Sequence, residues 1–163
     1  MSASPEHVAD EKVRRVVEAG AATGLTVEPV TFPEGTRTAA DAARAVGCDV
    51  AQIVKSLVFD GGGSPVLLLV SGANRVDIPT AATAAGLETL ERADAEVAKT
   101  ATGYSIGATP PIGLANELPI LMDEDLLQHD VVWAAAGRPD SVFVVEPGAL
   151  ARASGAKVCR LTT

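Results

Sequence analysis

A lysine inside an otherwise apolar segment is the first feature of this sequence that could do chemistry. Residues 53–59 read Ile-Val-Lys-Ser-Leu-Val-Phe, a pattern typical of a strand, and Lys55 is the only charge among them. Because alternate side chains of a strand share a face, Lys55 lies on the face of Leu57 and Phe59, and Ser56 lies on the other. If the first face is buried, the ammonium of Lys55 lies at the edge of a cavity and requires an anionic partner. The alternative is an edge-strand lysine whose stem lies along apolar surface and discourages aggregation.

A stiff loop at residues 107–113 is the second candidate. It contains two prolines, which fix φ, and two glycines, which permit φ values that other residues avoid. Such a loop can present its backbone N–H and C=O groups to a ligand, and rigid donors stabilise the charge that develops during acyl transfer. The alternative is a plain turn between two strands. The candidate residues of this loop are Gly107, Ala108, Thr109, Pro110, Pro111 and Gly113.

The common catalytic and metal-binding motifs are absent from the sequence, so we expect neither a cofactor nor a metal. His7 and His129 stand alone, and the sequence has no Cys-x-x-Cys pair. It also has neither a Gly-x-Ser-x-Gly elbow nor a phosphate-binding P-loop. Two cysteines, Cys48 and Cys159, are too few for a disulfide framework, and we interpret them as reduced thiols.

Length and charge limit the possible partners. The 163 residues fit one domain, residues 1–163, and a 3% aromatic content predicts an aliphatic core. The formal net charge of -8 argues against a wide nucleic-acid interface, because each phosphate contact requires a lysine or arginine. No apolar run reaches the roughly 20 residues of a membrane helix, and the first ten residues do not resemble a secretory signal. We therefore expect a cytoplasmic protein that binds neither a membrane nor DNA.

Short helices and strands must position the two candidates. The helix that follows Thr38 and the helix that follows Asp94 have side-chain caps at their starts, and Gly47 and Gly103 end them. Helices are predicted at residues 5–22, 39–46, 77–86, 95–101 and 147–153, and strands at 25–32, 53–59, 65–70, 104–106, 118–122, 131–135, 141–145 and 157–161. The glycines at 61–63 predict a hairpin between two of the strands. The order is neither strictly βαβ nor all-β, so the expected fold class is α+β or mixed α/β, a curled, barrel-like mixed sheet of about seven strands flanked by short helices.

Taken in order, these segments resemble the YbaK-type family of aminoacyl-tRNA editing proteins. Residues 51–59 are similar to the lysine-bearing strand of the family, and residues 65–77 are similar to the next block. The segment from Gly107 to Pro111 resembles the family's Gly-x-x-x-Pro loop. Residues 121–123 and 132–138 resemble its C-terminal strands. The same domain is similar to the editing insertion of bacterial prolyl-tRNA synthetases.

The resemblance implies a hydrolase that acts on a mischarged tRNA. The bond cleaved would be the ester between a wrong amino acid and the 3′-terminal adenosine, in editing of the tRNA-Pro type. The implied partners are the 3′ end of an aminoacyl-tRNA and, as a second possibility, an aminoacyl-tRNA synthetase. Because only the tip of the tRNA needs to enter the site, a small basic patch suffices despite the acidic composition.

The resemblance also implies which residues form the site. Lys55 corresponds to the key polar residue of the family, and we expect its ammonium to face the loop that lines the aminoacyl pocket. A basic patch is expected from Lys55, Arg75 and Arg138. The substrate-binding residues implied are Ser56, Asn74, Arg75, Asp77, Gly113, Gly137 and Arg138. The chain departs from related sequences at Ala108, where many have glycine, and at Leu114, where many have histidine.

Two other functions fit the same sequence. A non-catalytic module of the same fold could dock tRNA or a synthetase, and Ala108, Leu114 and the acidic composition favour that alternative. A hydrolase of a different small ester or thioester is the second alternative, which activity on a free aminoacyl ester but not on aminoacyl-tRNA would indicate.

Overall fold

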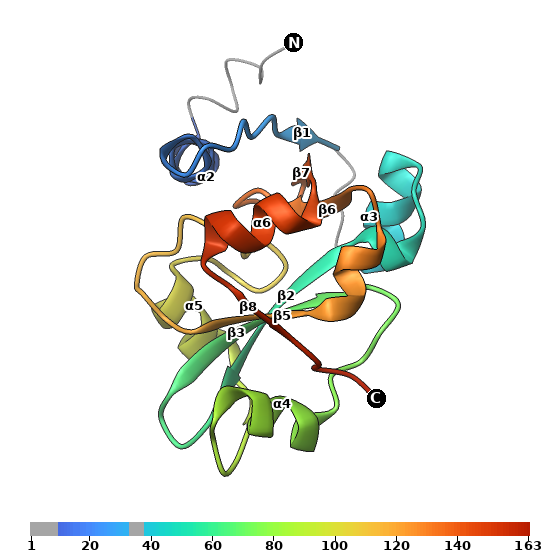
Figure 1. Ribbon diagram of the computed structural model, residues 1–163. Helices are drawn as coiled ribbons and strands as arrows, with labels where there is room; N and C mark the ends of the chain where they lie inside the picture. Colours follow the sequence, from blue (N-terminus) through green and yellow to red (C-terminus); the bar gives the residue numbers. More distant parts are fainter. Residues whose placement is uncertain (1–9, 33–37) are drawn as a thin grey trace.

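The computed structural model describes residues 10–32 and 38–163, and Figure 1 shows the arrangement of their helices and strands. The helices are α2 (Glu11–Ala22), α3 (Ala39–Val46), α4 (Ile78–Ala85), α5 (Ala95–Thr102) and α6 (Pro147–Ser154), with 3-10 turns η1 (Val50–Gln52) and η2 (Glu124–Gln128). The strands are β1 (Val30–Thr31), β2 (Val54–Asp60), β3 (Pro65–Ser71), β4 (Glu91–Arg92), β5 (Ile120–Asp123), β6 (Val132–Ala135), β7 (Ser141–Val145) and β8 (Lys157–Cys159). A mixed α+β fold is therefore confirmed.

The helix caps predicted from the sequence are present. The Thr38 hydroxyl accepts a hydrogen bond from the backbone N–H of Asp41 at 3.0 Å, and Asp94 caps α5 in the same manner at 2.8 Å. Gly47 and Gly103 end their helices in the left-handed conformation. Asp10 caps α2, and the start predicted for this helix at residue 5 lies outside the described residues.

The strands form two open sheets, so the expectation of one curled, barrel-like sheet is corrected. One sheet has the order β1-β7-β6, and the other has the order β4-β2-β3-β5-β8. The predicted hairpin is present, with β2 and β3 antiparallel from the pair Val54 and Ser71 to the pair Asp60 and Pro65. Alternation along a strand reveals the strand but not its partner, so the division into two sheets had no signal in the sequence.

Two of the predicted strands differ in the structure for local reasons. In the segment 25–32 only Val30 and Thr31 pair with another strand, because the N–H of Leu25 binds the carbonyl of Gly20 at the end of α2 instead. The segment that begins at Tyr104 forms turns and no strand. The two-residue strand β4 had not been predicted, since two residues show no periodicity.

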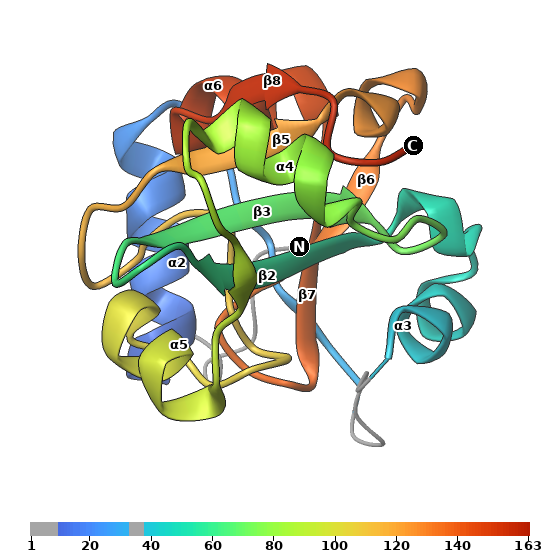
Figure 2. The same cartoon turned by 90° about the horizontal axis from the view of Figure 1, so that it is seen from below.

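The core lies between the two sheets, and β3 is buried on both faces. One face of the five-stranded sheet packs against the inner face of the three-stranded sheet, through side chains that include Val58, Leu69 and Phe143. The other face is covered by α4, which lies along β3 in Figure 2. Ser56 therefore points toward the space between the sheets, whereas Lys55 points toward the α4 side. Within the described residues, no helix is long and apolar enough to cross a membrane.

Candidate functional site

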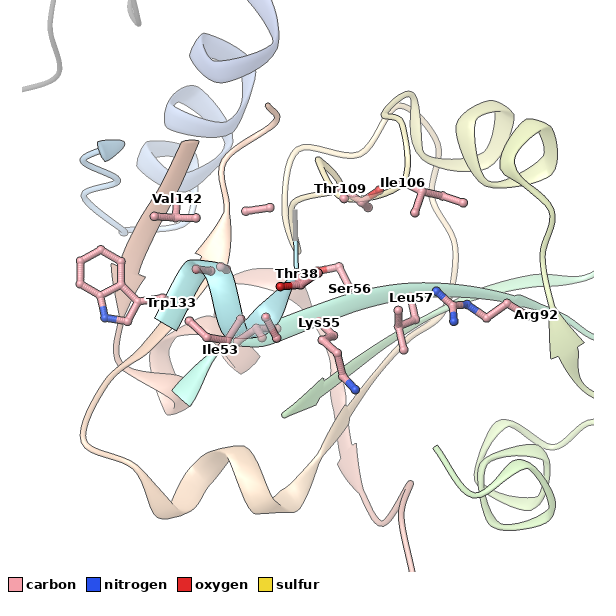
Figure 3. Close-up of a pocket in the computed structure, with 16 residues that line it drawn as sticks. Thr38, Ile53, Lys55, Ser56, Leu57, Arg92, Ile106, Thr109, Trp133 and Val142 are labelled. Atoms are coloured by element: carbon pink, nitrogen blue, oxygen red, sulfur yellow. The ribbon is translucent and has the colours of Figure 1, made fainter. Parts of the chain in front are cut away.

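A pocket with a volume of about 250 Å³ lies beside β2, between β6, α3 and the loop at residues 104–113. It brings together four of the residues predicted from the sequence, Lys55, Ser56, Gly107 and Thr109. Figure 3 shows that segments far apart in the chain meet here, with Trp133 and Val142 at one end and Arg92 at the other. The remaining lining residues are Thr38, Ala39, Ala42, Ile53, Val54, Leu57, Ile106, Ala134 and Ala135.

The pocket is open because one edge of β2 has only a short strand partner. Strand β4 pairs with β2 at Phe59 and Asp60, and Ala93 donates to the carbonyl of Val58 at 3.1 Å. At the start of β2, Ile53 forms an isolated parallel bridge with Trp133. Backbone groups of alternate residues point to the same edge of an antiparallel strand, so those of Ser56 point to the edge that Val58 uses. The N–H and C=O of Ser56 therefore face the pocket, and no backbone hydrogen bond between described residues occupies them, so they can bind a ligand.

Two hydroxyl groups lie in the same part of the pocket. The Oγ atom of Ser56 is buried and has no hydrogen-bond partner among the residues that the structure describes. Thr109 is only 3% exposed, and its hydroxyl donates to the carbonyl of Ser105 at 3.2 Å, which leaves its own lone pairs free to accept. A buried hydroxyl without a partner is unfavourable, so a ligand or water that binds Ser56 removes a cost that the empty site carries.

Lys55 makes a different contact from the one predicted. Its ammonium donates to the backbone carbonyl of Asn74 at 2.5 Å, and no ion pair between described residues includes it. Figure 3 shows Lys55 and Ser56 leaving β2 on opposite sides, with Thr109 on the side of Ser56. The expectations of an anionic partner and of an ammonium that faces the 107–113 loop are therefore corrected. The reason is strand alternation, since neighbouring residues cannot point to the same face.

Positive charge gathers at the end of the pocket near Arg92. Burial lowers the pKa of the Lys55 ammonium below its usual 10.5, and the nearby charges of Arg92 and Arg75 lower it further. The guanidinium of Arg92 lies 6.0 Å from the centre of the Phe59 ring. Among the described residues, neither arginine forms an ion pair within 4.0 Å with an acidic side chain. Three neighbouring cations without acidic partners favour an anionic ligand such as a phosphodiester.

The loop after β3 holds the carbonyl that Lys55 contacts. The side-chain amide of Asn74 donates to Asp125 at 2.8 Å, so Asn74 is fixed on both its side chain and its main chain. Asp77 caps α4 by accepting from the N–H of Thr80 at 3.2 Å, and its own N–H binds the carbonyl of Leu161. Asn74 and Asp77 thus build the loop, and neither lines the pocket.

The 107–113 loop is divided between two surfaces. Gly107 has a φ of 88° and lines the pocket with Thr109, whereas Ala108 and Pro110 are buried outside it. The methyl group of Ala108 therefore does not narrow the pocket, and its φ is not positive. Pro111, Gly113 and Leu114 line a separate groove with α2.

Gly137 and Arg138 do not reach the pocket. The guanidinium of Arg138 forms ion pairs with Asp10 at 3.3 Å and with Asp140 at 3.0 Å. Gly137 lies against the backbone of Lys12 in α2. The predicted basic patch of Lys55, Arg75 and Arg138 is therefore corrected, because Arg92 and not Arg138 lines the pocket.

Sequence reasoning missed Arg92, Trp133, Thr38 and Ile106 as members of the site. Thr38 was identified only as a helix cap, and Arg92 lies in a strand too short to recognise. Trp133 carries the one available signal, because it is the single tryptophan of a chain that is poor in aromatic residues.

The fold and this pocket agree with what comparison with known proteins finds. The chain belongs to the aminoacyl-tRNA editing domain family, whose model matches residues 33–153. It is 30% identical to YwhH, an uncharacterised protein of Bacillus subtilis (strain 168), over 78% of this chain and 81% of that protein. It is 25% identical to EbsC of Enterococcus faecalis (strain ATCC 700802 / V583), a proposed Cys-tRNA(Pro)/Cys-tRNA(Cys) deacylase, over 77% of each chain.

The same domain occurs inside a larger enzyme. The chain is 33% identical to part of the proline–tRNA ligase of Acidithiobacillus ferrooxidans (strain ATCC 53993 / BNL-5-31), over 63% of this chain but only 18% of the ligase. Among solved structures, a proposed trans-editing enzyme for prolyl-tRNA synthetase superposes with a TM-score of 0.88 at 42% identity, over 94% of this chain and 98% of that one. The chain is therefore similar both to the editing domain of prolyl-tRNA synthetases and to a separate editing protein.

Proposed function

We propose that the protein is a trans-acting deacylase that hydrolyses the ester between a wrong amino acid and the 3′-terminal adenosine of a tRNA. The observation that carries this proposal is the pocket at the open edge of β2, where backbone donors, two hydroxyl groups and a cationic end meet. Membership in the editing family supports it. The chain covers most of YwhH and EbsC, which supports action as a separate protein rather than as a synthetase insertion.

The geometry suits ester hydrolysis without a protein nucleophile. The oxygen of water bonds to the carbonyl carbon, the bond to the ribose oxygen breaks, and that oxygen takes up a proton. Fixed donors stabilise the negative charge that develops on the carbonyl oxygen, and the N–H and the hydroxyl of Ser56 are such donors. The hydroxyl of Thr109 donates to Ser105, so it can accept a hydrogen bond from the attacking water. The neighbouring hydroxyl of the terminal ribose can relay the proton, so the protein supplies positioning and electrostatics.

The cationic end of the pocket is the place for the phosphate of the terminal nucleotide. Lys55 and Arg92 line the pocket, and Arg75 lies close enough to lower the pKa of Lys55. A phosphate bound here fixes the ribose ester over Ser56 and Thr109. We further propose editing of a tRNA-Pro type, because a structural relative is a proposed trans-editing enzyme for prolyl-tRNA synthetase.

The decisive test is a deacylation panel with the purified protein and tRNAs that carry cognate or wrong amino acids. We expect rapid release of at least one wrong amino acid from tRNA-Pro, with correctly charged prolyl-tRNA left intact. Release of no amino acid from any tRNA, together with measurable binding to tRNA, would instead establish a non-catalytic tRNA-binding module. Hydrolysis of free aminoacyl esters alone would instead establish a hydrolase of a different small ester or thioester.

We predict that binding to tRNA depends only weakly on salt. Each phosphate neutralised on a single strand adds roughly 0.7 to the slope of log affinity against log salt, so one to three contacts give about -1 to -2. The measurement compares full tRNA with a short CCA-ended acceptor mimic over a salt series. A slope near -6, with the mimic binding far more weakly than tRNA, would mean an extensive contact with the tRNA body and would contradict a site that reads only the tip.

We also predict that alkaline pH weakens binding of the 3′ end. The pKa of Lys55 is lowered by burial and by the charges of the two arginines, so its ammonium loses its proton at a lower pH than an ordinary lysine does. Affinity for a CCA-ended DNA oligonucleotide, which resists alkali, should fall as pH rises through this lowered pKa. Lys55→Arg should remove that loss, because a guanidinium stays protonated across the range. An identical alkaline loss in both proteins would show that another group causes it.

A further inference from the structure

The outer face of the three-stranded sheet is apolar and continues from the pocket to the surface. Paired residues of neighbouring strands share a face, which puts Val30 with Val142 and Trp133 with Val144. Val30 and Val144 are 40% and 41% exposed, whereas the opposite face of the sheet is buried in the core. Trp133 and Val142 also line the pocket, so the exposed valines extend the pocket wall.

Trp133 lies at the junction of pocket and surface. Trp133 packs against the small cluster formed by Ala42, Ala43 and Ile53, and it remains partly exposed. Tryptophan has a large apolar ring with one polar N–H, so it is common at binding surfaces that are apolar on one side and wet on the other. Trp133 thus offers an indole surface at the end of the pocket opposite Arg92.

We infer that Trp133, with Val144 beside it, is the stacking surface for a nucleobase of the single-stranded 3′ end of tRNA. This inference rests on the proposed function and adds the residue that reads the bases. Aromatic side chains bind single-stranded nucleic acid by stacking, which any base permits. With the phosphate held at Lys55 and Arg92, a base on Trp133 leaves the ester over Ser56 and Thr109 in the middle of the pocket.

The net charge of the protein favours base stacking over phosphate contacts as the main source of affinity for the tRNA end. A net charge of -8 opposes the approach of a polyanion, so a grip on tRNA cannot come mainly from phosphate contacts. Stacking is uncharged and contributes to affinity without adding to the salt dependence. Continuity of the apolar face with the pocket places this contribution next to the reacting ester.

The single tryptophan makes the inference directly measurable. The probe is an RNA hairpin with a CCA end that is not aminoacylated, compared with the same hairpin that lacks the terminal base. Binding of the intact hairpin should quench the fluorescence of Trp133. Trp133→Leu should weaken that binding about tenfold to a hundredfold, because leucine keeps the apolar packing against α3 but cannot stack. Trp133→Phe should retain most of the affinity, and the salt slope should be unchanged in both variants.

A cycle of variant and probe separates stacking from a purely structural role. If Trp133 stacks on the terminal base, Trp133→Leu and removal of that base each weaken binding, and the two losses together do not add. If the losses add, or if Trp133→Leu binds the intact hairpin as tightly as the unaltered protein, the inference is overturned. It is also overturned if Trp133→Leu leaves hairpin binding unchanged but shifts sedimentation from dimer to monomer, since the face would then join two copies of the chain.

Failure of this inference is distinguishable from failure of the proposed function. Deacylation with an unchanged KM in Trp133→Leu would overturn the stacking surface and leave the deacylase in place. If the losses from Trp133→Leu and from base removal do not add, but no substrate is deacylated, the stacking surface is supported. The protein would then bind the tRNA end without cleaving it.

Discussion

Lys55→Ala is expected to lower kcat/KM for deacylation by about 10²- to 10³-fold while the protein stays folded. Lys55 is the pocket lysine, and its ammonium lies close to the charges of Arg92 and Arg75. Without it, the phosphate of the terminal nucleotide loses a contact that fixes the ester over Ser56. Thermal unfolding and single-turnover rates per folded molecule should be measured together, because the hydrogen bond to Asn74 is lost as well.

The matched control is Lys99→Ala, which removes an exposed lysine from α5 and should change neither rate nor stability by much. Lys55→Arg keeps the charge and should recover part of the activity. If Lys55→Ala destabilises the fold while the rate per folded molecule is unchanged, the lysine serves only to hold the loop at Asn74. That result would remove Lys55 from the site.

Gly137→Ala is expected to destabilise the fold by about 2–4 kcal/mol. Gly137 has a φ of 98°, which is strained for any residue with a Cβ. An added Cβ would lie 2.9 Å from the carbonyl oxygen of Lys12 and 3.3 Å from the ring of Tyr104, so α2 would have to shift. The free energy of unfolding in denaturant measures the loss.

Gly155→Ala provides the matched control for strain without a clash. Its φ of 72° is also positive, but a Cβ there would meet no atom of the described residues within 4 Å. It should cost only about 1 kcal/mol. Equal losses in the two variants would show that α2 moves away from residue 137 at little cost. If Gly137→Ala stays stable but loses tRNA binding, Gly137 belongs to the substrate site after all.

Features that depend on neighbours in the chain were determined by the sequence alone. Thr38 and Asp94 cap the helices that follow them, and the glycines at 61–63 close the hairpin between β2 and β3. The position of Lys55 inside a strand and the order of motifs were sufficient to recognise the editing family. Caps, turns and alternation involve residues a few positions apart, so their physical causes can be read from the residues themselves.

Only the tertiary structure decided which of these residues meet. Arg92 and Trp133, 41 residues apart in the numbering, lie at opposite ends of one pocket, and no local pattern links them. Arg138 had been assigned to the basic patch, but it is held by Asp10 and Asp140, one of them 128 residues away. The direction of Lys55 followed from which sheet face α4 covers. These outcomes depend on the packing of distant segments against one another, and the division of the strands into two sheets, with an open edge at β2, created the pocket.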